Sequence, residues 1–532
     1  MIDTEKLPNN VQKLKKIIKH LDNDLQAEKD NAEKKINALL EQIRLFKDKL
    51  FGSKSEKHYE NDAQGFLFNE AEFEFDKEQL SSINQPEVEV KAHTRIKKGR
   101  RKLPEILERE VVEIDISESE KICPSGKSRK FIKWEISEKL DIKPPEVKVI
   151  QTKRAVYGCP DSCCVTCEEK KESPVKTAPV QPQLLAKTIV TPGLFAYLIA
   201  SKFCDHLPYY RMESIFNRFN IDVSRQTMCR WTIQVFRKYE ILQEMLWKEL
   251  LSGPLIGIDE TTMQVLLESG RSAKTKSYLW VFRGGNPRAP TIVFEYRETR
   301  SAKFLLELLK DYKGYIQTDG YKGYNYLEAL EDIVLIACWT HGRRKYDEAA
   351  RASKNKSSAQ QALSMIKRLY IIEKTAKDFT PEERQRLRKK ESVPILEKIK
   401  EWLDKKHFQV LPQSLIGKAV NYTLTLWPRL INYVDDGIIP IDNNGVENAL
   451  RPECLGKKNW LFSYTPSGAS ASAFFYSLVE TAKANGLEPY WYLRYLFQQI
   501  IQVETEEEMR NLLPQYVNRE EIKEYRMPGK WG

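Results

Sequence analysis

The stretch from residue 254 to residue 340 constrains the fold most, because strand and helix patterns follow one another there in a definite order. Three apolar, β-rich runs joined by Gly, Asn and Pro turns come first, at 254–266 (PLIGIDETTMQVL), 277–283 (SYLWVFR) and 291–297 (TIVFEYR). A helix is predicted next at 301–312, then a strand at 314–319, a helical segment at 321–329 and a strand at 334–340. Three meandering strands followed by helix, strand, helix, strand predict an α/β domain.

Two aspartates stand out within this pattern. Asp259 lies inside the first strand, among the apolar residues of IGID, and Asp319 ends the fourth strand. A carboxylate buried among such residues costs several kcal/mol unless something neutralises it, and a cation shared by Asp259 and Asp319 would do so. The alternative for Asp319, which precedes Gly320, is a cap or a turn. The strand order is that of a ribonuclease H-like domain, and both aspartates lie where the metal ligands of that fold belong.

A third carboxylate is needed if two divalent ions about 4 Å apart are to act on a phosphodiester. The segment PIDNNGVENALRPECLGKKNWLFS supplies Glu447, four residues before Arg451 and eleven before Lys458. These spacings are close to one and three helical turns, so one continuous helix would align the acid with two phosphate-binding cations. The alternative, which Pro452 and Gly456 favour, is that helix continuity is lost beyond Arg451 and that Lys458 lies in a loop.

A helix-turn-helix is predicted upstream of the strands. An amphipathic helix at 211–218 is followed by the turn Phe-Asn-Ile-Asp and by a second helix, SRQTMCRWTIQVF, which Ser224 can cap. The second helix would present Arg225, Gln226 and Arg230 to a DNA groove. The alternative is that two short helices joined by a turn are common in any helical domain.

Residues 8–52 are predicted to form one long helix with a coiled-coil seam. Apolar or small residues recur in steps of three and four between dense Lys, Glu and Asp, with one slip near Ala32. The seam consists of Leu14, Ile18, Leu21, Leu25, Ala32, Ile36, Leu39, Ile43, Phe46 and Leu50. The expected role is self-association, and the alternative is a helix that packs on its own protein.

The segment after this helix is linker-like, and its charge is polarised. Residues 60–90 contain nine acids and one lysine, whereas residues 91–102 contain seven bases and no acid. The basic run around Gly99 includes Lys97, Lys98, Arg100 and Arg101. Such a run can lie along phosphates or reach into a minor groove, and the alternative is a solvated linker.

Strand-like alternation at 111–170 accompanies five cysteines, which are Cys123, Cys159, Cys163, Cys164 and Cys167. A zinc ribbon needs two chelating pairs so that four thiolates can surround one Zn²⁺ ion. Here Gly126 stands where the partner of Cys123 would be. The alternatives are a zinc site and a decayed ribbon that packing alone holds together.

Composition limits the class of protein. With 41% hydrophobic and 30% charged residues, fibrous, collagen-like and wholly disordered classes are excluded. The net charge of +11 gives a mild preference for a polyanionic partner. No apolar run approaches the roughly 18 residues of a membrane helix, the start MIDTEKLPNN has no signal pattern, and nine cysteines fit reduced thiols, so a cytoplasmic protein is expected.

Eight motifs together resemble the large catalytic subunit of the insertion sequence 66 family of transposases. They occur in order, almost from end to end: LFGSKSEK at 50–57, DHLPYYR at 205–211, GIDET at 257–261, TDGYKGY at 318–324, THGRRKY at 340–346, IDNNGVENALRP at 441–452, GKKNWLFS at 456–463 and ETAKANGLEPYWYL at 480–493. By this resemblance the Asp-Asp-Glu triad maps onto Asp259, Asp319 and Glu447, which are 60 and 128 residues apart.

The family resemblance also implies a leucine-rich amino-terminal helix, a zinc-binding segment of cysteine pairs, a helix-turn-helix and a catalytic core. The chain departs from that pattern at the zinc segment, where Gly126 replaces a cysteine and Cys159 and Cys163 are separated by three residues. The expected architecture is therefore multidomain α+β, with a coiled-coil helix, a small cysteine-containing β segment, a helix-turn-helix and a ribonuclease H-like α/β core interrupted by a helical insertion.

The expected domain boundaries follow from the same patterns. They are 1–58 for the coiled-coil helix, 59–110 for the charged linker, 111–175 for the degenerate zinc-ribbon-like segment, 185–250 for the helical DNA-binding domain, 251–344 for the first part of the core, 345–438 for the insertion and 439–532 for the second part of the core with the carboxy-terminal helices.

The implied activity is metal-assisted phosphoryl transfer on double-stranded DNA, at the terminal repeats of the element and in the target. Two Mg²⁺ ions, or Mn²⁺ in their place, would be held by Asp259, Asp319 and Glu447, and Zn²⁺ is the further metal the cysteines suggest. Water would cut a strand at each element end, and the freed 3′-hydroxyl would attack target DNA. The groups expected to hold phosphate or the DNA backbone are Arg451, Lys458, His341, Arg343 and Arg344.

The expected partners are DNA, further copies of the chain and accessory proteins of the same element, in a bacterial cytoplasm at the nucleoid and without a membrane. Two rival functions stay open. One is a catalytically decayed copy that binds element ends as a repressor, which the weakened cysteine set favours. The other is a ribonuclease H-like nuclease that cuts strands but does not join them.

Overall fold

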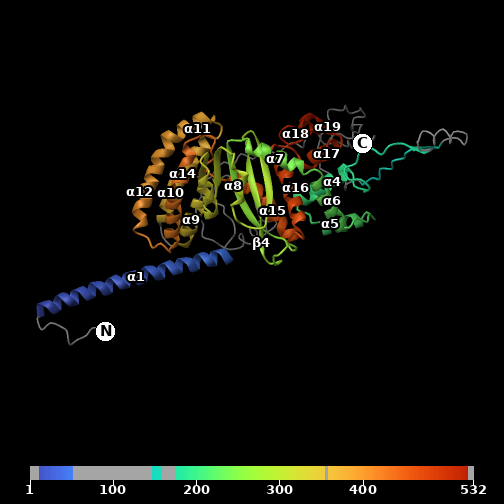
Figure 1. The fold of residues 1–532 in the computed structure, drawn as a ribbon. Helices are drawn as coiled ribbons and strands as arrows, with labels where there is room; N and C mark the ends of the chain where they lie inside the picture. The colour runs from blue at the N-terminus through green and yellow to red at the C-terminus, as the bar shows by residue number, and fades with distance from the viewer. Residues whose placement is uncertain (1–10, 52–146, 159–174, 354–357, 525–532) are drawn as a thin grey trace, which may run out of the picture. The chain divides into compact units, whose positions relative to one another are not determined.

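The computed structural model describes residues 11–51, 147–158, 175–353 and 358–524 (Figure 1). The chain forms two compact units, one of residues 56–180 and the other of residues 1–55 with 181–532. In the first, β1 (Val156–Gly158) and β2 (Val175–Thr177) pair antiparallel. The five cysteines of the predicted zinc segment and the basic run Lys97, Lys98, Arg100 and Arg101 lie outside the described residues, so both remain predictions.

A five-stranded mixed sheet forms the centre of the larger unit. Its strands are β3 (Leu255–Gln264), β4 (Lys276–Asn286), β5 (Ala289–Arg297), β6 (Gly314–Thr318) and β7 (Ile333–Ala337). They lie in the order β5-β4-β3-β6-β7, in which β3, β4 and β5 form an antiparallel meander and β6 and β7 are parallel to β3. The five predicted strands are thus confirmed, and β3 is the central one.

Three predicted element boundaries differ from the structure. The helix expected at 301–312 is reduced to α8 (Phe304–Leu308), because Leu309 leaves the helical region with φ −107° and the chain turns toward β6. The helical segment expected at 321–329 is the 3₁₀ helix η2 (Lys322–Ala329). The last strand ends at Ala337 instead of residue 340, because the buried Trp339 ring leaves the sheet and donates from Nε1 to Leu430 O.

Helices cover the sheet and its β5 edge. Packing places α7 (Ile241–Leu251) against β4 and β5, α15 (Asn444–Trp460) against β3 and β4, and α16 (Pro466–Ala484) along β5. The Thr481 hydroxyl of α16 accepts from Ile292 N at 3.0 Å and donates to Ile292 O at 2.9 Å, so side chains satisfy backbone groups of this edge strand. The edge is therefore closed to further strands at this position.

The segment predicted as a helix-turn-helix contains two helices, α5 (Tyr209–Asn217) and α6 (Arg225–Lys238), preceded by α4 (Pro192–Phe203). Ser224 is the N-cap of α6, and its hydroxyl accepts from Thr227 N at 3.2 Å, as the sequence predicted. The carboxy-terminal helices of the larger unit are α17 (Pro489–Gln499), which packs on α4, α18 (Glu506–Asn511) and α19 (Arg519–Glu524). These helices share one apolar core with the sheet.

The helices between β7 and α15 lie together (Figure 1), and they share a second apolar core with the end of β7. They are α9 (Trp339–Ala352), α10 (Ser358–Thr375), α11 (Pro381–Leu387), the π-helical turn η3 (Arg388–Ser392), α12 (Val393–His407), α13 (Leu415–Thr425), α14 (Trp427–Ile431) and the 3₁₀ turn η4 (Asn432–Val434). The buried Arg388 guanidinium joins them by donating to Glu373 at 2.6 Å and to the carbonyls of Tyr433 and Asp436.

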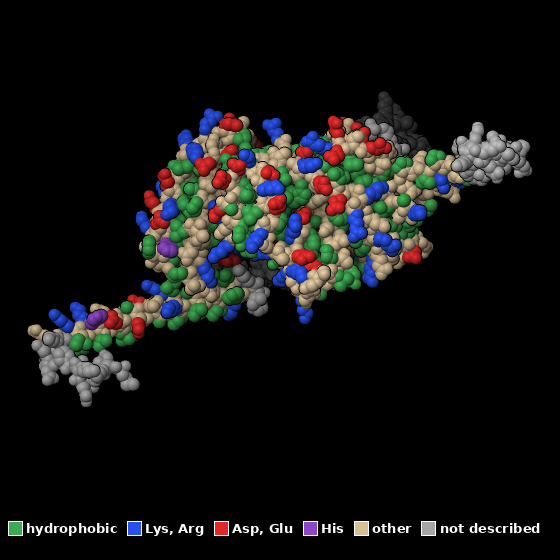
Figure 2. Space-filling model, in the orientation of Figure 1, with side chains coloured by type: hydrophobic (Ala, Val, Ile, Leu, Met, Phe, Trp, Pro, Cys, Tyr) green, Lys and Arg blue, Asp and Glu red, His purple; other side chains and the backbone are tan. Residues whose placement is uncertain are grey.

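The predicted long amino-terminal helix is α1 (Val11–Phe51). Its last turns contact α9 and α13, where Leu45 is buried and Gln42 Nε2 donates to Gln413 O at 3.1 Å. Leu14 of the predicted seam is half-buried, whereas the seam residues from Ile18 to Phe46 are exposed, and Figure 2 shows hydrophobic side chains along one side of the helix. None of the helices in the described residues is long and apolar enough to cross a membrane.

Candidate active site

Asp259 lies in the middle of β3, the central strand of the sheet, where it is paired with Val281 of β4. Burial raises the pKa of its carboxyl group to about 7, the amide of Glu260 opposes this rise by donating to Oδ1 at 2.8 Å, and the negative charges of Glu260, Asp319 and Glu447 add to it. Asp259 of β3 is therefore close enough to Asp319, after β6, and to Glu447 of α15 for their charges to affect its pKa.

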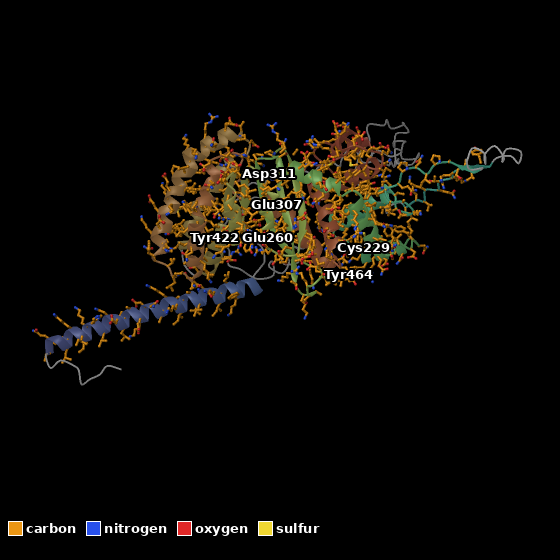
Figure 3. The ribbon with its side chains drawn as sticks, in the orientation of Figure 1. Cys229, Glu260, Glu307, Asp311, Tyr422 and Tyr464 are labelled. Atoms are coloured by element: carbon orange, nitrogen blue, oxygen red, sulfur yellow. The ribbon has the colours of Figure 1, made fainter. Side chains whose placement is uncertain are left out.

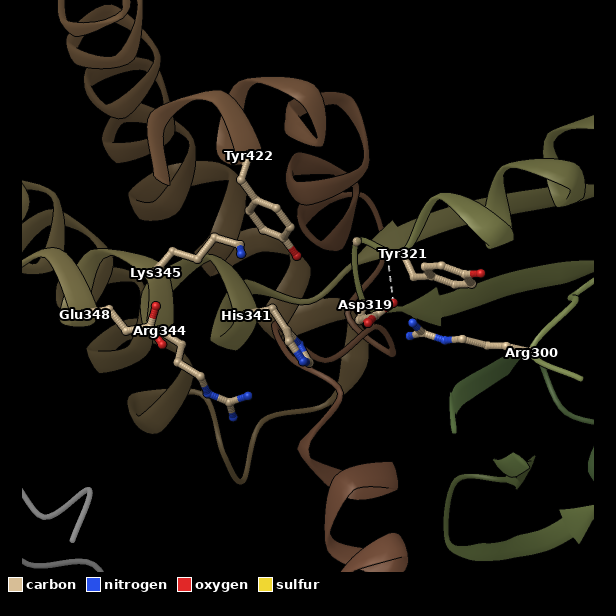
Figure 4. Close-up of a pocket in the computed structure, with 9 residues that line it drawn as sticks. Arg300, Asp319, Tyr321, His341, Arg344, Lys345, Glu348 and Tyr422 are labelled. Carbon is tan, nitrogen blue, oxygen red and sulfur yellow. Dashed lines mark hydrogen bonds between the residues drawn. The ribbon is translucent and has the colours of Figure 1, made fainter. Parts of the chain in front are cut away.

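Asp319 follows the last residue of β6, so the parallel pairing of β6 with β3 brings it beside the centre of the sheet. Its Oδ1 accepts from Tyr321 N at 2.8 Å, so Asp319 does close the turn that the sequence left as an alternative. It also lines a pocket of about 410 Å³ (Figure 4). A Cβ atom at Gly320 would lie 2.5 Å from Leu426 Cδ1 and 2.6 Å from Tyr422 Cε2, so a larger residue there would have to displace these side chains.

Glu447 lies in the first turn of α15 and faces α9. Its Oε2 is 3.5 Å from Arg344 Nη2, and its Oε1 is 3.7 Å from His341 Nδ1. Glu447 Oε1 and His341 Nδ1 are both buried, and neither has a hydrogen-bond partner among the described residues. Burial lowers the pKa of His341, and the positive charge of Arg344 lowers it further, whereas the negative charge of Glu447 raises it. The net effect is a lowered pKa, so the His341 ring is neutral at pH 7.

Close packing holds α15 against β3. A Cβ atom at Gly257 would lie 2.5 Å from both Asn443 Oδ1 and Val446 Cγ2, so the helix approaches the strand where a side chain is missing. Asn443, the residue before α15, donates from Nδ2 to Ile258 O at 3.0 Å. At the other end Lys457 Nζ donates to Thr261 Oγ1 at 2.8 Å. These contacts fix the position of Glu447 relative to Asp259.

Of the two alternatives for this helix, the continuous one is observed. α15 runs without a break from Asn444 to Trp460 with Pro452 inside it. The proline removes one backbone hydrogen bond, but the contacts of Asn443 and Lys457 with β3 hold the helix at both ends. The exposed Lys458 therefore lies on the helix instead of in a loop, and its spacing places it on the same side as Glu447 and the partly buried Arg451.

Sequence reasoning missed Glu260, the residue after Asp259. Its buried carboxylate accepts from Arg300 Nε at 2.6 Å and from the Tyr324 hydroxyl. The Arg300 guanidinium also lies over the Tyr321 ring, 3.7 Å from its centroid. The signal available in the sequence was a second acid inside a strand that is otherwise buried, which requires a partner as much as Asp259 does.

The pocket brings together some of the predicted DNA-contacting residues and leaves others outside it. His341 and Arg344 line it together with Asp319, and so do Lys345 and Tyr422, which the sequence did not single out (Figure 4). Lys345 Nζ lies 4.6 Å from the centroid of the Tyr422 ring. Of the three predicted carboxylates only Asp319 lines it, and Asp259 and Glu447 do not. The predicted DNA-contacting residues that the structure describes and that do not line it are Arg343, Arg451, Lys458, Arg225, Gln226 and Arg230. The last three are exposed on α6.

The residues present fit a divalent cation. Cys338, His341 and Glu447 each offer a ligand atom, and these atoms lie within 4.8 Å of one another. Burial raises the pKa of Cys338 to about 12, and its sulfur accepts from Asn443 N, so the thiol stays protonated and is a poor ligand. The remaining donors are Glu447 Oε1, which has no hydrogen-bond partner among the described residues, and the carboxylates of Asp259 and Asp319. Mg²⁺ and Mn²⁺ prefer such a set of oxygen ligands.

Comparison with known proteins gives matches along most of the chain. The sequence model described as transposase IS66 family matches residues 187–471, the one described as IS66 C-terminal element matches 477–515, and the one described as transposase C of IS166 homeodomain matches 38–112. The uncharacterized protein y4jD of Sinorhizobium fredii is 30% identical over 426 residues, which cover 77% of this chain and 81% of that protein. The uncharacterized protein y4qI of the same organism is 28% identical over 402 residues, 73% of this chain and 72% of that protein.

Proposed function

The chain belongs to the IS66 family of transposases, and from this premise we propose that it is a DDE transposase with a ribonuclease H-like core, which cuts DNA at the ends of an insertion element and joins them to target DNA. One observation carries the proposal: the buried Asp259 carboxylate feels the charges of Asp319 and Glu447, which come from two other elements. Mutual repulsion and burial of three acids destabilise the fold, and a bound cation would remove this destabilisation.

Asp259, Asp319 and Glu447 would hold divalent cations, which supply polarisation of the phosphate and activation of the attacking hydroxyl group. In the first reaction water attacks the phosphorus and the 3′-oxygen leaves as a hydroxyl. In the second, that 3′-hydroxyl attacks a target phosphodiester, and the displaced 3′-oxygen of the target strand leaves. Both are in-line exchanges of one P–O bond for another, so one site can serve both.

The positive side chains around the pocket have separate tasks in this mechanism. Arg344 and Lys345 line the pocket with Asp319 and would attract the phosphate backbone into it. Arg344 also limits the repulsion that Glu447 feels, at 3.5 Å from Oε2. Arg451 and Lys458 would bind phosphates along α15, and Arg225, Gln226 and Arg230 would contact the DNA grooves from α6. The neutral His341 would hold or accept a proton at Nδ1, beside Glu447.

The test uses the purified chain, labelled DNA that carries the ends of its own element, and Mg²⁺ or Mn²⁺. We expect cut ends and joined products from the wild-type chain, and binding without either product from Asp259→Asn. Asp311→Asn is the matched control, because Asp311 is an exposed aspartate away from the site, as Figure 3 shows relative to Glu260 and Tyr422. Activity that survives in Asp259→Asn would contradict the assignment.

Two other outcomes would favour the rival functions. Cutting without joining would support a ribonuclease H-like nuclease, or a requirement for an accessory protein of the same element. Binding without cutting by the wild-type chain would support a decayed copy that represses its relatives. The unbroken set of Asp259, Asp319 and Glu447 favours the transposase over the repressor.

A further inference from the structure

Three large apolar side chains are exposed directly after α15. Leu461, Phe462 and Tyr464 expose 68%, 44% and 63% of their surfaces. We refer to these three residues as the tip. Exposed apolar residues are ordinary when they are scattered, but three within four positions form a patch that needs an explanation.

The backbone of the tip is fixed to the end of β3. Ser463, inside the tip segment, donates from its amide to Gln264 O at 2.9 Å and accepts from Leu266 N at 3.0 Å. Tyr464 O accepts from Leu267 N at 3.0 Å. Because β3 also carries Asp259, the tip has a defined position relative to the carboxylates. A rigid backbone presents its side chains to a partner without an entropic cost of ordering.

Leu461 has a strained backbone conformation, and burial of its side chain among the described residues does not account for it. Its φ is +66° and its ψ is −43°, a γ-turn conformation across which Phe462 N donates to Trp460 O at 2.8 Å, and a leucine in it is strained. The Leu461 side chain is mostly exposed, so burial within this chain does not offset the strain. A binding partner that covers the side chain would offset it.

The surroundings of the tip are basic and include arginines of α5 and α6. Residues 454–479 contain two lysines and no acid. Arg211 of α5 donates from Nη1 to Asn459 Oδ1 at 3.4 Å, before the tip, and Arg237 of α6 donates from Nη2 to Ser467 Oγ at 3.2 Å, after it. Figure 3 marks Tyr464 and, on α6, Cys229. A polyanion held by α5 and α6 would therefore meet the tip.

We propose that the tip is an apolar wedge that enters bound DNA between two base pairs and unstacks them, an inference that rests on the proposed function. Apolar side chains that enter a duplex in this way kink it and widen its contact with the protein. From Glu447 to Trp460 the helix rises about 20 Å, which equals about six base pairs. The unstacked step thus lies about six base pairs from the phosphate at the carboxylates.

Two observations favour DNA over a second copy of the chain as the occupant. In a symmetric contact the tips and their surroundings would face each other, and Arg211, Lys458 and Arg237 of both copies would repel. Phosphates would instead be attracted by the same side chains. Trp460 itself is unsuited to stacking on a base, because Lys202 Nζ lies over its ring, 3.9 Å from the centroid.

The experiment places 2-aminopurine, which brightens when it is unstacked, at successive positions in a duplex of the element's end, with Ca²⁺ in place of Mg²⁺ so that no strand is cut. We expect the wild-type chain to brighten one step about six base pairs from the cut. Phe462→Ala combined with Tyr464→Ala should lose most of this signal. With Mg²⁺ the double variant should cut paired DNA about tenfold more slowly or worse, and a mismatch at that step should restore its rate.

Phe408→Ala is the matched control, because Phe408 is 88% exposed and follows α12 in the insertion. It should behave as the wild-type chain. The inference is overturned if no step brightens with the wild-type chain, if the double variant brightens the step fully, or if the variant changes only the oligomeric mass of the protein. Brightening that depends on the tip in a chain that cuts no DNA would support the wedge and count against the proposed function.

Discussion

Arg300 Nε donates a 2.6 Å hydrogen bond to Oε1 of Glu260, a carboxylate whose side chain is only 2% exposed. No cation of this kind lies beside the adjacent Asp259 among the described residues, and burial, with a smaller effect of the acids around it, raises its pKa. Two neighbouring acids of β3 thus differ in whether a positive side chain is paired with them. Arg300 pairs with Glu260 inside the fold, whereas under the proposed function a divalent cation would neutralise Asp259.

Removal of the Arg300 cation should destabilise the fold. In Arg300→Ala the buried Glu260 charge loses its partner, and we expect a loss of roughly 2 kcal/mol, less than for a fully buried pair because Arg300 itself is 41% exposed. Urea unfolding measures this loss. Arg297→Ala is the control, since its pair with Glu295 is 3.2 Å long and more open to solvent, and it should cost under about 1 kcal/mol. Equal losses in both variants would contradict the role given to Glu260.

Asp259→Asn should stabilise the metal-free chain, and more so at higher pH. The pKa of Asp259 is about 7 in the folded chain and 3.8 for an ordinary aspartate. Between these values the folded state keeps a proton that the unfolded state has lost, so stability falls as the pH rises from about 4 to about 7, and the loss is complete above about 7. The variant removes this loss, so its gain should be small at about pH 5 and largest at about pH 8.

Thermal unfolding with a chelator at both pH values measures this gain, which should be on the order of 5 °C at the higher pH. Mg²⁺ should then raise the unfolding temperature of the wild-type chain and leave Asp259→Asn nearly unchanged. Asp311→Asn should follow the wild-type chain in both respects. If Mg²⁺ stabilised the wild-type chain and Asp259→Asn equally, Asp259 would not be a ligand.

The strands, and the position of Asp259 inside one of them, could be predicted because each depends on local pattern. β-rich runs, their turns and an aspartate among apolar residues are visible in the sequence between residues 254 and 319. The cap of α6 by Ser224 is equally local. Predictions failed or stayed open where distant contacts override local preference. Pro452 stays inside α15 because both ends of the helix are bonded to β3, and Trp339 leaves the sheet because its ring belongs to the second core.

Partners that lie far apart in the sequence also escaped prediction. Arg300 meets Glu260 across 40 residues, and His341 meets Glu447 across more than a hundred. Nothing in the local sequence of Tyr422 shows that it packs beside Gly320. Such pairs follow from the sheet order and from the insertion that folds back on β7, which no periodicity encodes.

The exposed seam of α1 should mediate self-association. Ile36 and Ile43 are 57% and 51% exposed on the apolar side, seven residues apart as in a heptad. Lysine at both positions should reduce the oligomeric mass in sedimentation equilibrium and leave the unfolding temperature of the core within about 2 °C, because both side chains are mostly exposed. Lysine at Asp30, outside the seam, should leave the mass unchanged. An unaltered mass in the double variant would show that α1 serves another purpose.

Gly257→Ala should damage activity more than stability. The new Cβ atom would lie 2.5 Å from Asn443 Oδ1 and Val446 Cγ2, a distance at which one side must move. Asn443 and Val446 flank the start of α15, so the shift displaces Glu447, one residue further on. A displacement of about 1 Å at a reacting centre can cost roughly a hundredfold in rate.

Rates of cutting, compared with urea unfolding, separate these effects. Gly468→Ala is the control, because the nearest atom to its new Cβ would be Thr465 Oγ1 at 3.5 Å, an ordinary contact. It should keep its activity, since neither α15 nor β3 has to move. If Gly257→Ala lost stability but cut DNA at the wild-type rate, the distance between β3 and α15 would not control the position of Glu447. The packing of a strand glycine against a helix start would then be a requirement of folding alone.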